Sequence, residues 1–190
     1  MIYEFCAENV TLLEKAMQAG ARRIELCDNL VVGGTTPSYG VTKAAVELAA
    51  NYDTTIMTMI RPRGGDFVYN DLEVAIMLED IALTAQAGIQ GVVFGALTAD
   101  KKLDKANLEK LIVASKGMEI VFHMAFDELS EQDQLEAIDW LNQVGVTRIL
   151  TRAGVSGDSL EKRFSHYHRI LEHAAGKIEI LPGGGIDMDN

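Results

Sequence analysis

The sequence predicts an α/β fold of the TIM-type (β/α) barrel class, with seven strands visible. Short β-rich runs alternate with amphipathic helical runs along the chain, which is typical of a parallel sheet whose strands are linked by helices. Chemically reactive residues end at least five of these strands: Cys6, Cys27, Arg61, His123 and Gly183–Gly185. A barrel gathers many strand ends on one face, whereas an open doubly wound sheet gathers them at one crevice. We therefore favour the barrel.

The predicted strands are short runs rich in β-branched and apolar residues. In order, they are Ile2–Cys6, Arg23–Cys27, Thr54–Ile60, Gly91–Gly95, Met118–His123, Thr147–Thr151 and Lys177–Leu181. The chain has no linker, low-complexity tract or shift in composition, so we expect residues 1–190 to form a single domain. Because a TIM barrel has eight strands, we expect the last βα portion to be missing or to lie beyond Asn190.

The predicted helices lie between these strands and repeat apolar residues at steps of three and four. They lie near Val10–Ala19, Val41–Asn51, Asp71–Ala87, Lys105–Ser115, Glu131–Gln143 and Leu160–Ala175. Five of them are followed by a glycine suited to a helix C-terminus: Gly20, Gly88, Gly117, Gly145 and Gly176. No G-x-G-x-x-G motif follows the first strand, which argues against a dinucleotide-binding fold.

The net charge of the chain limits the classes of partner that it can bind. The chain has 17 Lys and Arg against 28 Asp and Glu, a net charge of −11. This charge repels phosphate backbones and anionic lipid, so we expect no nucleic-acid or membrane partner. The first residues carry Glu4 where a signal peptide has Lys or Arg, and no apolar run approaches the about 18 to 20 residues of a membrane span. We expect a reduced, cytoplasmic compartment, in which any cysteine chemistry belongs to a site.

A repeated motif ends the first two strands, with Glu4 and Cys6 on one and Glu25 and Cys27 on the next. Strand residues two apart share a face, and neighbouring strands lie about 4.8 Å apart. Two thiolates bound to one metal ion lie at most about 4.6 Å apart, so a soft ion such as Cu(I) could bridge the pair. The alternative is that both cysteines are small buried apolar residues.

Two arginines follow the third strand and are candidates for binding an anion. Arg61 and Arg63 precede a glycine pair and Asp66. The guanidinium group suits carboxylate or phosphate, and glycines let backbone approach a ligand closely. The alternative is a structural Arg–Asp bridge within the loop.

Two further strand ends carry candidate residues. His123 could act in acid–base chemistry or bind a metal, with Asp127 either orienting it or holding a loop; a purely structural histidine is an equal alternative. Gly183, Gly184 and Gly185 follow the seventh strand, where barrels frequently bind phosphate. A tight turn is the alternative there.

Six segments, in order through essentially the whole chain, carry a family resemblance: 25–28 (ELCD), 33–38 (GGTTPS), 60–67 (IRPRGGDF), 122–123 (FH), 125–127 (AFD) and 182–185 (PGGG). Together they resemble the copper homeostasis protein CutC family. The resemblance implies a TIM-type barrel, a cytoplasmic homo-oligomer (dimer or tetramer) and a role in handling intracellular copper. It also implies that Cys6 and Cys27 are Cu(I) ligands. Met124 departs from the pattern, since the family usually has an arginine there.

Two functions of different class follow. The first is a cytoplasmic copper-binding protein that holds Cu(I), its cofactor, between Cys6 and Cys27. The second is a TIM-barrel enzyme acting on a small anionic or phosphorylated substrate. In the second, Arg61, Arg63 and Gly183–Gly185 bind the anion. The candidates for proton transfer are His123, Glu25 and Asp66.

Overall fold

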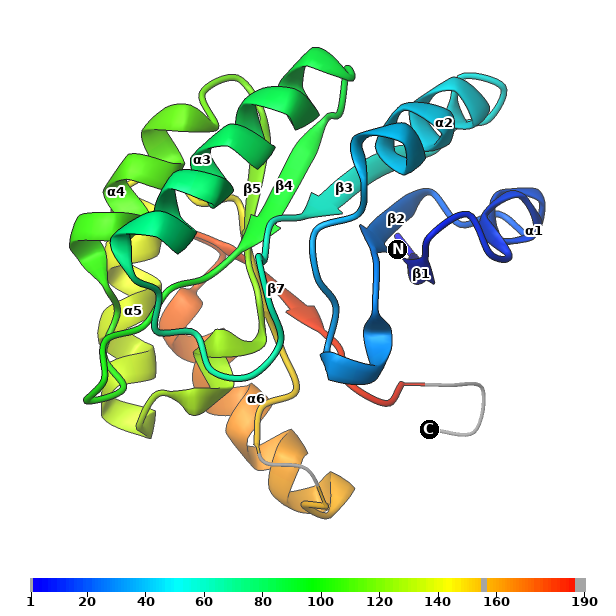
Figure 1. Ribbon diagram of the computed structural model, residues 1–190. Helices are drawn as coiled ribbons and strands as arrows, with labels where there is room; N and C mark the ends of the chain where they lie inside the picture. Colours follow the sequence, from blue (N-terminus) through cyan, green and yellow to red (C-terminus); the bar gives the residue numbers. More distant parts are fainter. Residues whose placement is uncertain (1, 155–156, 187–190) are drawn as a thin grey trace.

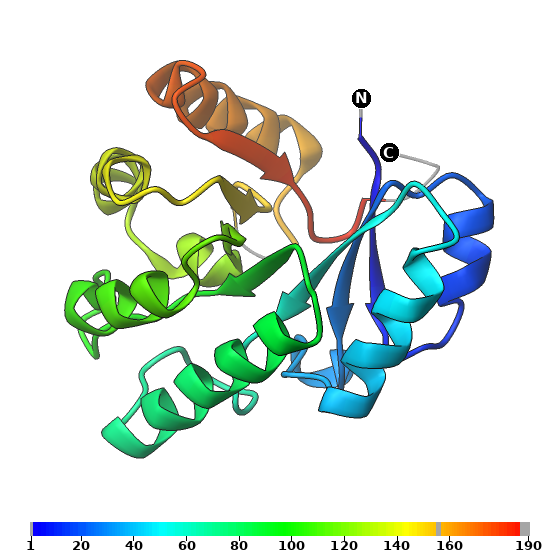
Figure 2. The same cartoon turned by 90° about the horizontal axis from the view of Figure 1, so that it is seen from above.

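The computed structural model describes residues 2–154 and 157–186. Seven parallel strands form one sheet in the sequential order β1-β2-β3-β4-β5-β6-β7. The sheet curls, and the helices cover its outer face (Figures 1 and 2). Sequential parallel strands joined by outer helices are the arrangement of a TIM-type barrel, so the predicted fold class is confirmed.

All seven predicted strands are present. They are β1 (Glu4–Glu8), β2 (Arg23–Cys27), β3 (Thr55–Met59), β4 (Gly91–Phe94), β5 (Glu119–Phe122), β6 (Arg148–Thr151) and β7 (Glu179–Pro182). The largest difference from prediction is at β1, which begins and ends two residues later than expected. It continues to Glu8 because the chain stays paired with β2 up to Cys27.

The six predicted helices are also present. They are α1 (Leu13–Gln18), α2 (Tyr39–Ala49), α3 (Asp71–Gln86), α4 (Lys105–Ala114), α5 (Glu131–Gln143) and α6 (Leu160–Ala174), with short 3₁₀ helices η1 (Leu30–Val32) and η2 (Met124–Glu128). Helix α1 is shorter than predicted because Asn9 and Leu12 have φ of 57° and 58°. These left-handed residues turn the chain before the helix begins.

Most of the apolar core lies between the sheet and its helices. One large buried cluster packs β4 to β7 against α3 to α6, and a second packs β1 to β3 against α1 and α2. A third, smaller cluster lies on the inner face of the sheet, and it consists of Cys27, Met57, Met59, Val93 and Val121. The inside of the barrel is therefore rich in sulfur.

A network of ion pairs lies at the amino-terminal ends of the strands. Arg23 of β2 binds Glu4 and also Glu179 of β7, the latter at 3.3 Å. Arg148 of β6 binds Glu119 at 2.6 Å and Glu179 at 3.2 Å. Because an arginine of the second strand contacts a glutamate of the seventh, the sheet is curled strongly enough to bring these strands together. We call this group of five ion-paired residues the barrel floor: Glu4, Arg23, Glu119, Arg148 and Glu179.

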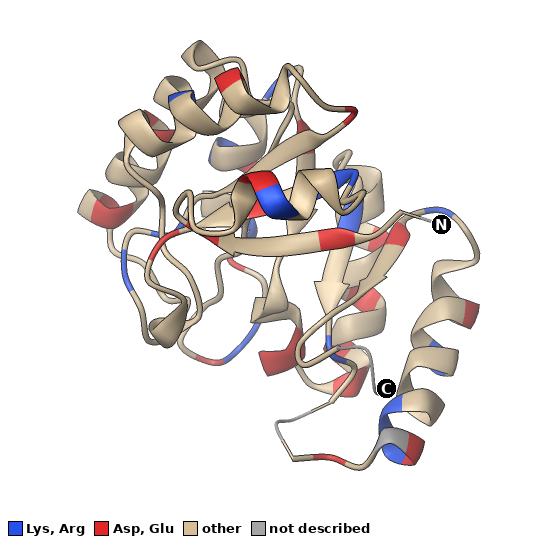
Figure 3. Ribbon diagram, turned by 90° about the vertical axis from the view of Figure 1, so that its right-hand side faces the viewer, with Lys and Arg blue, Asp and Glu red and all other residues tan. Residues whose placement is uncertain are grey.

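The outer surface carries charges of both signs. Figure 3 shows Lys and Arg interspersed with Asp and Glu on the outer helices and loops. Among the described helices, none has the length and apolar character that a bilayer crossing requires.

Candidate functional site

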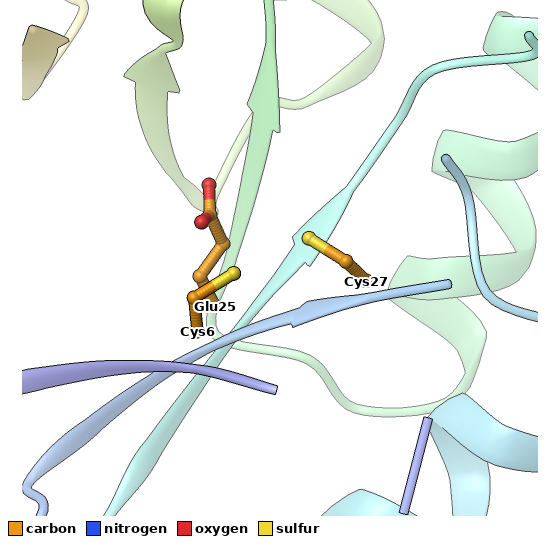
Figure 4. Close-up of side chains that lie close together, drawn as sticks. All are labelled: Cys6, Glu25 and Cys27. Atoms are coloured by element: carbon orange, nitrogen blue, oxygen red, sulfur yellow. The ribbon is translucent and has the colours of Figure 1, made fainter. Parts of the chain in front are cut away.

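Three of the predicted residues come together inside the barrel. The ligand atoms of Cys6, Glu25 and Cys27 all lie within 4.8 Å of one another. Figure 4 shows the Cys27 sulfur directed toward Cys6 and Glu25. Cys27 and Glu25 are buried, whereas Cys6, on strand β1, is exposed. The site is therefore reachable from the side of β1.

The register of β1 and β2 sets this geometry. Cys6 pairs with Glu25, and Glu8 pairs with Cys27. The two cysteines are thus offset by two residues along the strands rather than directly opposite. A shift of two residues keeps every side chain on its face, so both sulfurs still lie on the inner side. Glu4 pairs with Arg23 in the barrel floor, which leaves Glu25 as the carboxyl group beside the thiols.

The two thiols have different electrostatic surroundings. A hydrogen bond from the Cys27 thiol lowers the pKa of Cys6 to about 7. The same contact, together with burial, raises the pKa of Cys27. Cys6 is therefore the group that carries thiolate character near neutral pH, and Cys27 is its donor.

The surroundings of Glu25 favour its neutral form. Burial raises its pKa well above the usual range, and the negative charges of Cys6 and Glu4 raise it further. Its Oε1 atom is buried and has no hydrogen-bond partner among the described residues. A protonated carboxyl group can donate to a neighbouring thiolate, so Glu25 can support the sulfurs without adding a negative charge.

This donor set fits a soft metal ion. Two metal–sulfur bonds of about 2.3 Å span at most about 4.6 Å, so a small side-chain adjustment lets one ion contact both sulfurs. Thiolates select Cu(I), whereas carboxylates suit harder ions. Because Glu25 favours its neutral form, the sulfur pair decides the preference of the site.

The arginines predicted to bind an anion are used in holding loops. The two Nη atoms of Arg61 donate to the carbonyl oxygens of Val32, Gly34 and Gly65 at 2.7 to 2.9 Å. Arg61 has only its Nε atom without a partner in the described chain. Its role toward an anion stays a prediction.

Arg63 and Asp66 form a bridge of the kind weighed as the structural alternative. The guanidinium of Arg63 binds Asp66 at 3.0 Å and Glu73 at 2.5 Å, and it also donates to the Val68 carbonyl. The backbone N–H of Val68 donates to the Asp66 carboxylate. This hydrogen bond and the contact with Arg63 keep the pKa of Asp66 below its usual range. Asp66 therefore lies in an exposed ion pair, and its proposed proton transfer stays a prediction.

His123 is buried and neutral. Burial lowers its pKa to about 3, and the charge of Arg61 adds to the effect. Its Nδ1 accepts from the Ala125 N–H at 3.2 Å, which assigns the ring proton to Nε2. That Nε2 is buried with no partner among the described residues, and the ring lies 4.8 Å from that of Phe67. His123 is thus placed to donate a hydrogen bond, and its catalytic role stays a prediction.

Asp127 holds a loop rather than His123. It accepts hydrogen bonds from the Thr151 hydroxyl and from the Arg152 N–H, the latter at 3.0 Å. Arg152 also lies beside the predicted glycine loop, with its Nε 3.1 Å from the position that a Cβ on Gly184 would occupy. The sequence interpretation missed Arg152, although an arginine directly after a predicted strand was a usable signal.

The glycine loop itself has the expected turn. Gly184 and Gly185 have φ of 75° and 85°, which favour glycine. The Gly183 N–H donates to the Thr151 carbonyl, and the carbonyls of Gly183 and Gly184 accept from Arg163 at 3.3 Å. Binding of an anion by these three glycines stays a prediction.

Comparison with known proteins decides the family. The CutC family profile matches residues 1–190. A CutC family protein of Enterococcus faecalis is 51% identical over 190 residues, which cover all of this chain and 91% of that protein. The chain belongs to the CutC family. The resemblance seen in the sequence motifs is therefore confirmed.

Two further relatives extend the CutC comparison. The human copper homeostasis protein cutC homolog is 40% identical over 189 residues, which cover all of this chain and 67% of that protein. The crystal structure of a CutC protein from Streptococcus agalactiae matches with a TM-score of 0.96 and 44% identity, covering all of this chain and 90% of that one. A deoxyribose phosphate aldolase from Aeropyrum pernix, at 13% identity and a TM-score of 0.69, shares the fold.

Proposed function

We propose that this CutC protein binds Cu(I) through Cys6 and Cys27 and thereby takes part in intracellular copper homeostasis. The observation that carries the proposal is the gathering of both sulfurs with the buried Glu25 carboxyl group within 4.8 Å. The human relative is named a copper homeostasis protein, which supports the same role here. Cu(I), when bound, would be held by the sulfur pair as cargo.

The protonation preferences of Cys6, Cys27 and Glu25 favour Cu(I) over harder ions. Cys6 has thiolate character near neutral pH, so one of the two sulfurs is ready to bind. Cys27 must lose its proton on binding, and metal binding characteristically releases such protons. Because burial raises the pKa of Glu25, its protonated form is favoured, which keeps the net charge of the site low.

A titration of Cu(I) against a competing chelator tests the proposal. Wild type, Cys6→Ser and Cys27→Ser should differ, with each serine variant losing at least about tenfold in affinity. Glu25→Gln is the matched control, because an amide reproduces the size and neutrality of the protonated acid. We expect it to bind Cu(I) as wild type does. Equal affinities in wild type and both serine variants would overturn the proposal.

A second candidate function is an enzymatic activity on a small anionic or phosphorylated substrate. It is favoured by the buried Nε2 of His123 and Nε of Arg61, two donors without partners in the described chain. Both side chains contact Phe67, at 4.8 Å ring to ring and 4.9 Å from the guanidinium carbon to the ring. Arg152, beside Gly184, supplies a further cation at this end of the barrel.

Thermal unfolding in the presence of inorganic phosphate and small carboxylates tests this candidate. Binding to the folded state raises the melting temperature. We expect a rise for wild type that Arg152→Gln reduces. Arg22→Gln, which removes an exposed arginine paired with Asp53, is the control and should keep the full rise. Absence of a rise with any of these anions would contradict anion binding.

We also propose that the protein is a cytoplasmic homo-oligomer, a dimer or a tetramer. Several large apolar side chains are exposed, among them Val31, Leu72, Val113 and Phe164, and association would remove them from water where a second copy of the chain covers them. Light scattering coupled to gel filtration should give a mass that is two or four times that of the chain. A monomer mass at micromolar concentration would exclude the oligomer.

A further inference from the structure

Sulfur at the candidate copper site is not confined to the two cysteines. Met57 and Met59 lie on β3, the strand next to β2, and both pack with Cys27 in the buried cluster on the inner face of the sheet. Met57 is 0% and Met59 4% exposed. Thioethers are soft ligands that, like thiolates, select Cu(I). Each methionine is therefore a candidate third sulfur ligand.

The two side chains differ in direction. The end of the Met59 side chain lies near Gly34, a residue that also lies beside Cys27. A Cβ placed on Gly34 would lie 3.2 Å from the Cys27 sulfur and 3.6 Å from the terminal methyl of Met59. The Cys27 sulfur and the terminal methyl of Met59 thus both border the position of Gly34. Because Gly34 has no side chain, it places no side-chain atom between the Cys27 sulfur and the Met59 methyl.

Met57 extends the other way. It pairs with Glu25 on one side and with Gly91 of β4 on the other. A Cβ placed on Gly91 would lie 2.7 Å from the Met57 sulfur. The Met57 thioether therefore fills the space over Gly91 of β4. The strand thus carries one buried methionine whose end borders the same glycine as the Cys27 sulfur, and a second buried methionine whose sulfur lies beside β4.

We propose that Met59 supplies a third, thioether ligand to Cu(I), in an inference that rests on the proposed copper site of Cys6 and Cys27. A neutral thioether adds a soft donor without adding charge. Zn²⁺ gains little from such a donor, because its protein ligands are thiolate, imidazole and carboxylate. Met59 therefore makes the site selective for Cu(I), while the cysteines provide the main bonds.

The experiment compares Met59→Leu with Met57→Leu in the full chain. Leucine conserves volume, and such swaps usually cost less than about 1.5 kcal/mol in a core. Each variant is titrated with Cu(I) against a competing chelator and, separately, with Zn²⁺. A second readout is X-ray absorption at the copper edge of selenomethionine-labelled protein, which detects selenium bonded directly to copper.

The expected result is a loss of at least about tenfold in Cu(I) affinity for Met59→Leu. Its Zn²⁺ affinity should be unchanged, and the copper–selenium signal of wild type should disappear. Met57→Leu should keep the signal and the Cu(I) affinity. The Met59 assignment is overturned if wild type shows no copper–selenium signal, or if that signal survives in Met59→Leu and is lost in Met57→Leu.

The failure of the Met59 ligand and the failure of the copper site are distinguishable. If Cys6→Ser and Cys27→Ser lose Cu(I) binding while Met59→Leu binds as wild type does, the thioether ligand is wrong and the copper site stands. If the serine variants bind Cu(I) as tightly as wild type, the copper site fails, and the Met59 proposal falls with it.

Discussion

The buried neutral imidazole of His123 makes stability depend on pH in a defined window. Its pKa is lowered by burial to about 3 in the folded protein, whereas an unfolded histidine titrates near about 6.5. Between these values the unfolded chain binds a proton that the folded chain does not. Stability is therefore complete above about pH 6.5 and falls as the pH is lowered toward 3.

The size of the effect follows from the two pKa values. Each pH unit within the window costs about 1.36 kcal/mol. Between pH 7.5 and pH 5, His123 should therefore remove about 2 kcal/mol from the free energy of unfolding. Because the side chain is only 3% exposed, solvent screening does little to reduce this value.

Urea unfolding of wild type and His123→Gln at pH 7.5 and pH 5 measures the effect. Glutamine removes the titration at this position, and the other titrating groups contribute to both proteins. The stability difference between the proteins should therefore shift by about 2 kcal/mol in favour of the variant at the lower pH. A difference that does not change with pH would refute the buried, neutral state of His123.

Two further predictions concern the framework that carries the site. Phe126 is fully buried in the cluster between the sheet and the helices, so Phe126→Ala should lower the free energy of unfolding by about 3 to 5 kcal/mol; a loss below about 1 kcal/mol in urea unfolding would contradict this packing. Asn70 caps α3 in a capping box with Glu73, so Asn70→Ala should cost about 1 kcal/mol in the same assay. An unchanged midpoint would show that the cap contributes nothing.

The fold could be predicted from the sequence because its signals are local. Apolar runs and helical periodicity predicted every described strand and α-helix but neither 3₁₀ helix, and glycines such as Gly20 and Gly88 end helices with φ of 96° and 86°. The start of α1 could not be predicted, because Asn9 and Leu12 are left-handed without being glycine. Propensity does not reveal such conformations when the surrounding structure imposes them.

The candidate site was predicted in composition but not in geometry. Strand patterning has a period of two residues, so an offset of two between β1 and β2 leaves the pattern unchanged. The pairing of Cys6 with Glu25 therefore came from the structure. The contacts of Arg61 were also out of reach of the sequence. An arginine is known to offer N–H donors, but the carbonyl oxygens of Val32 and Gly34 that accept its hydrogen bonds belong to another loop. Only the folded structure shows that Nε is the one Arg61 nitrogen left without a partner among the described residues.

The barrel floor has a consequence for how the chain folds. Arg23 and Glu179 are separated by 156 residues, and closing so long a loop delays the contact that requires it. Cys6 and Cys27, by contrast, belong to consecutive paired strands joined by one short helix. The two proposed metal ligands are thus brought together by short-range pairing, whereas the barrel floor forms only once β7 has joined the sheet. The proposed Cu(I) site is therefore expected to form earlier in folding than the barrel floor.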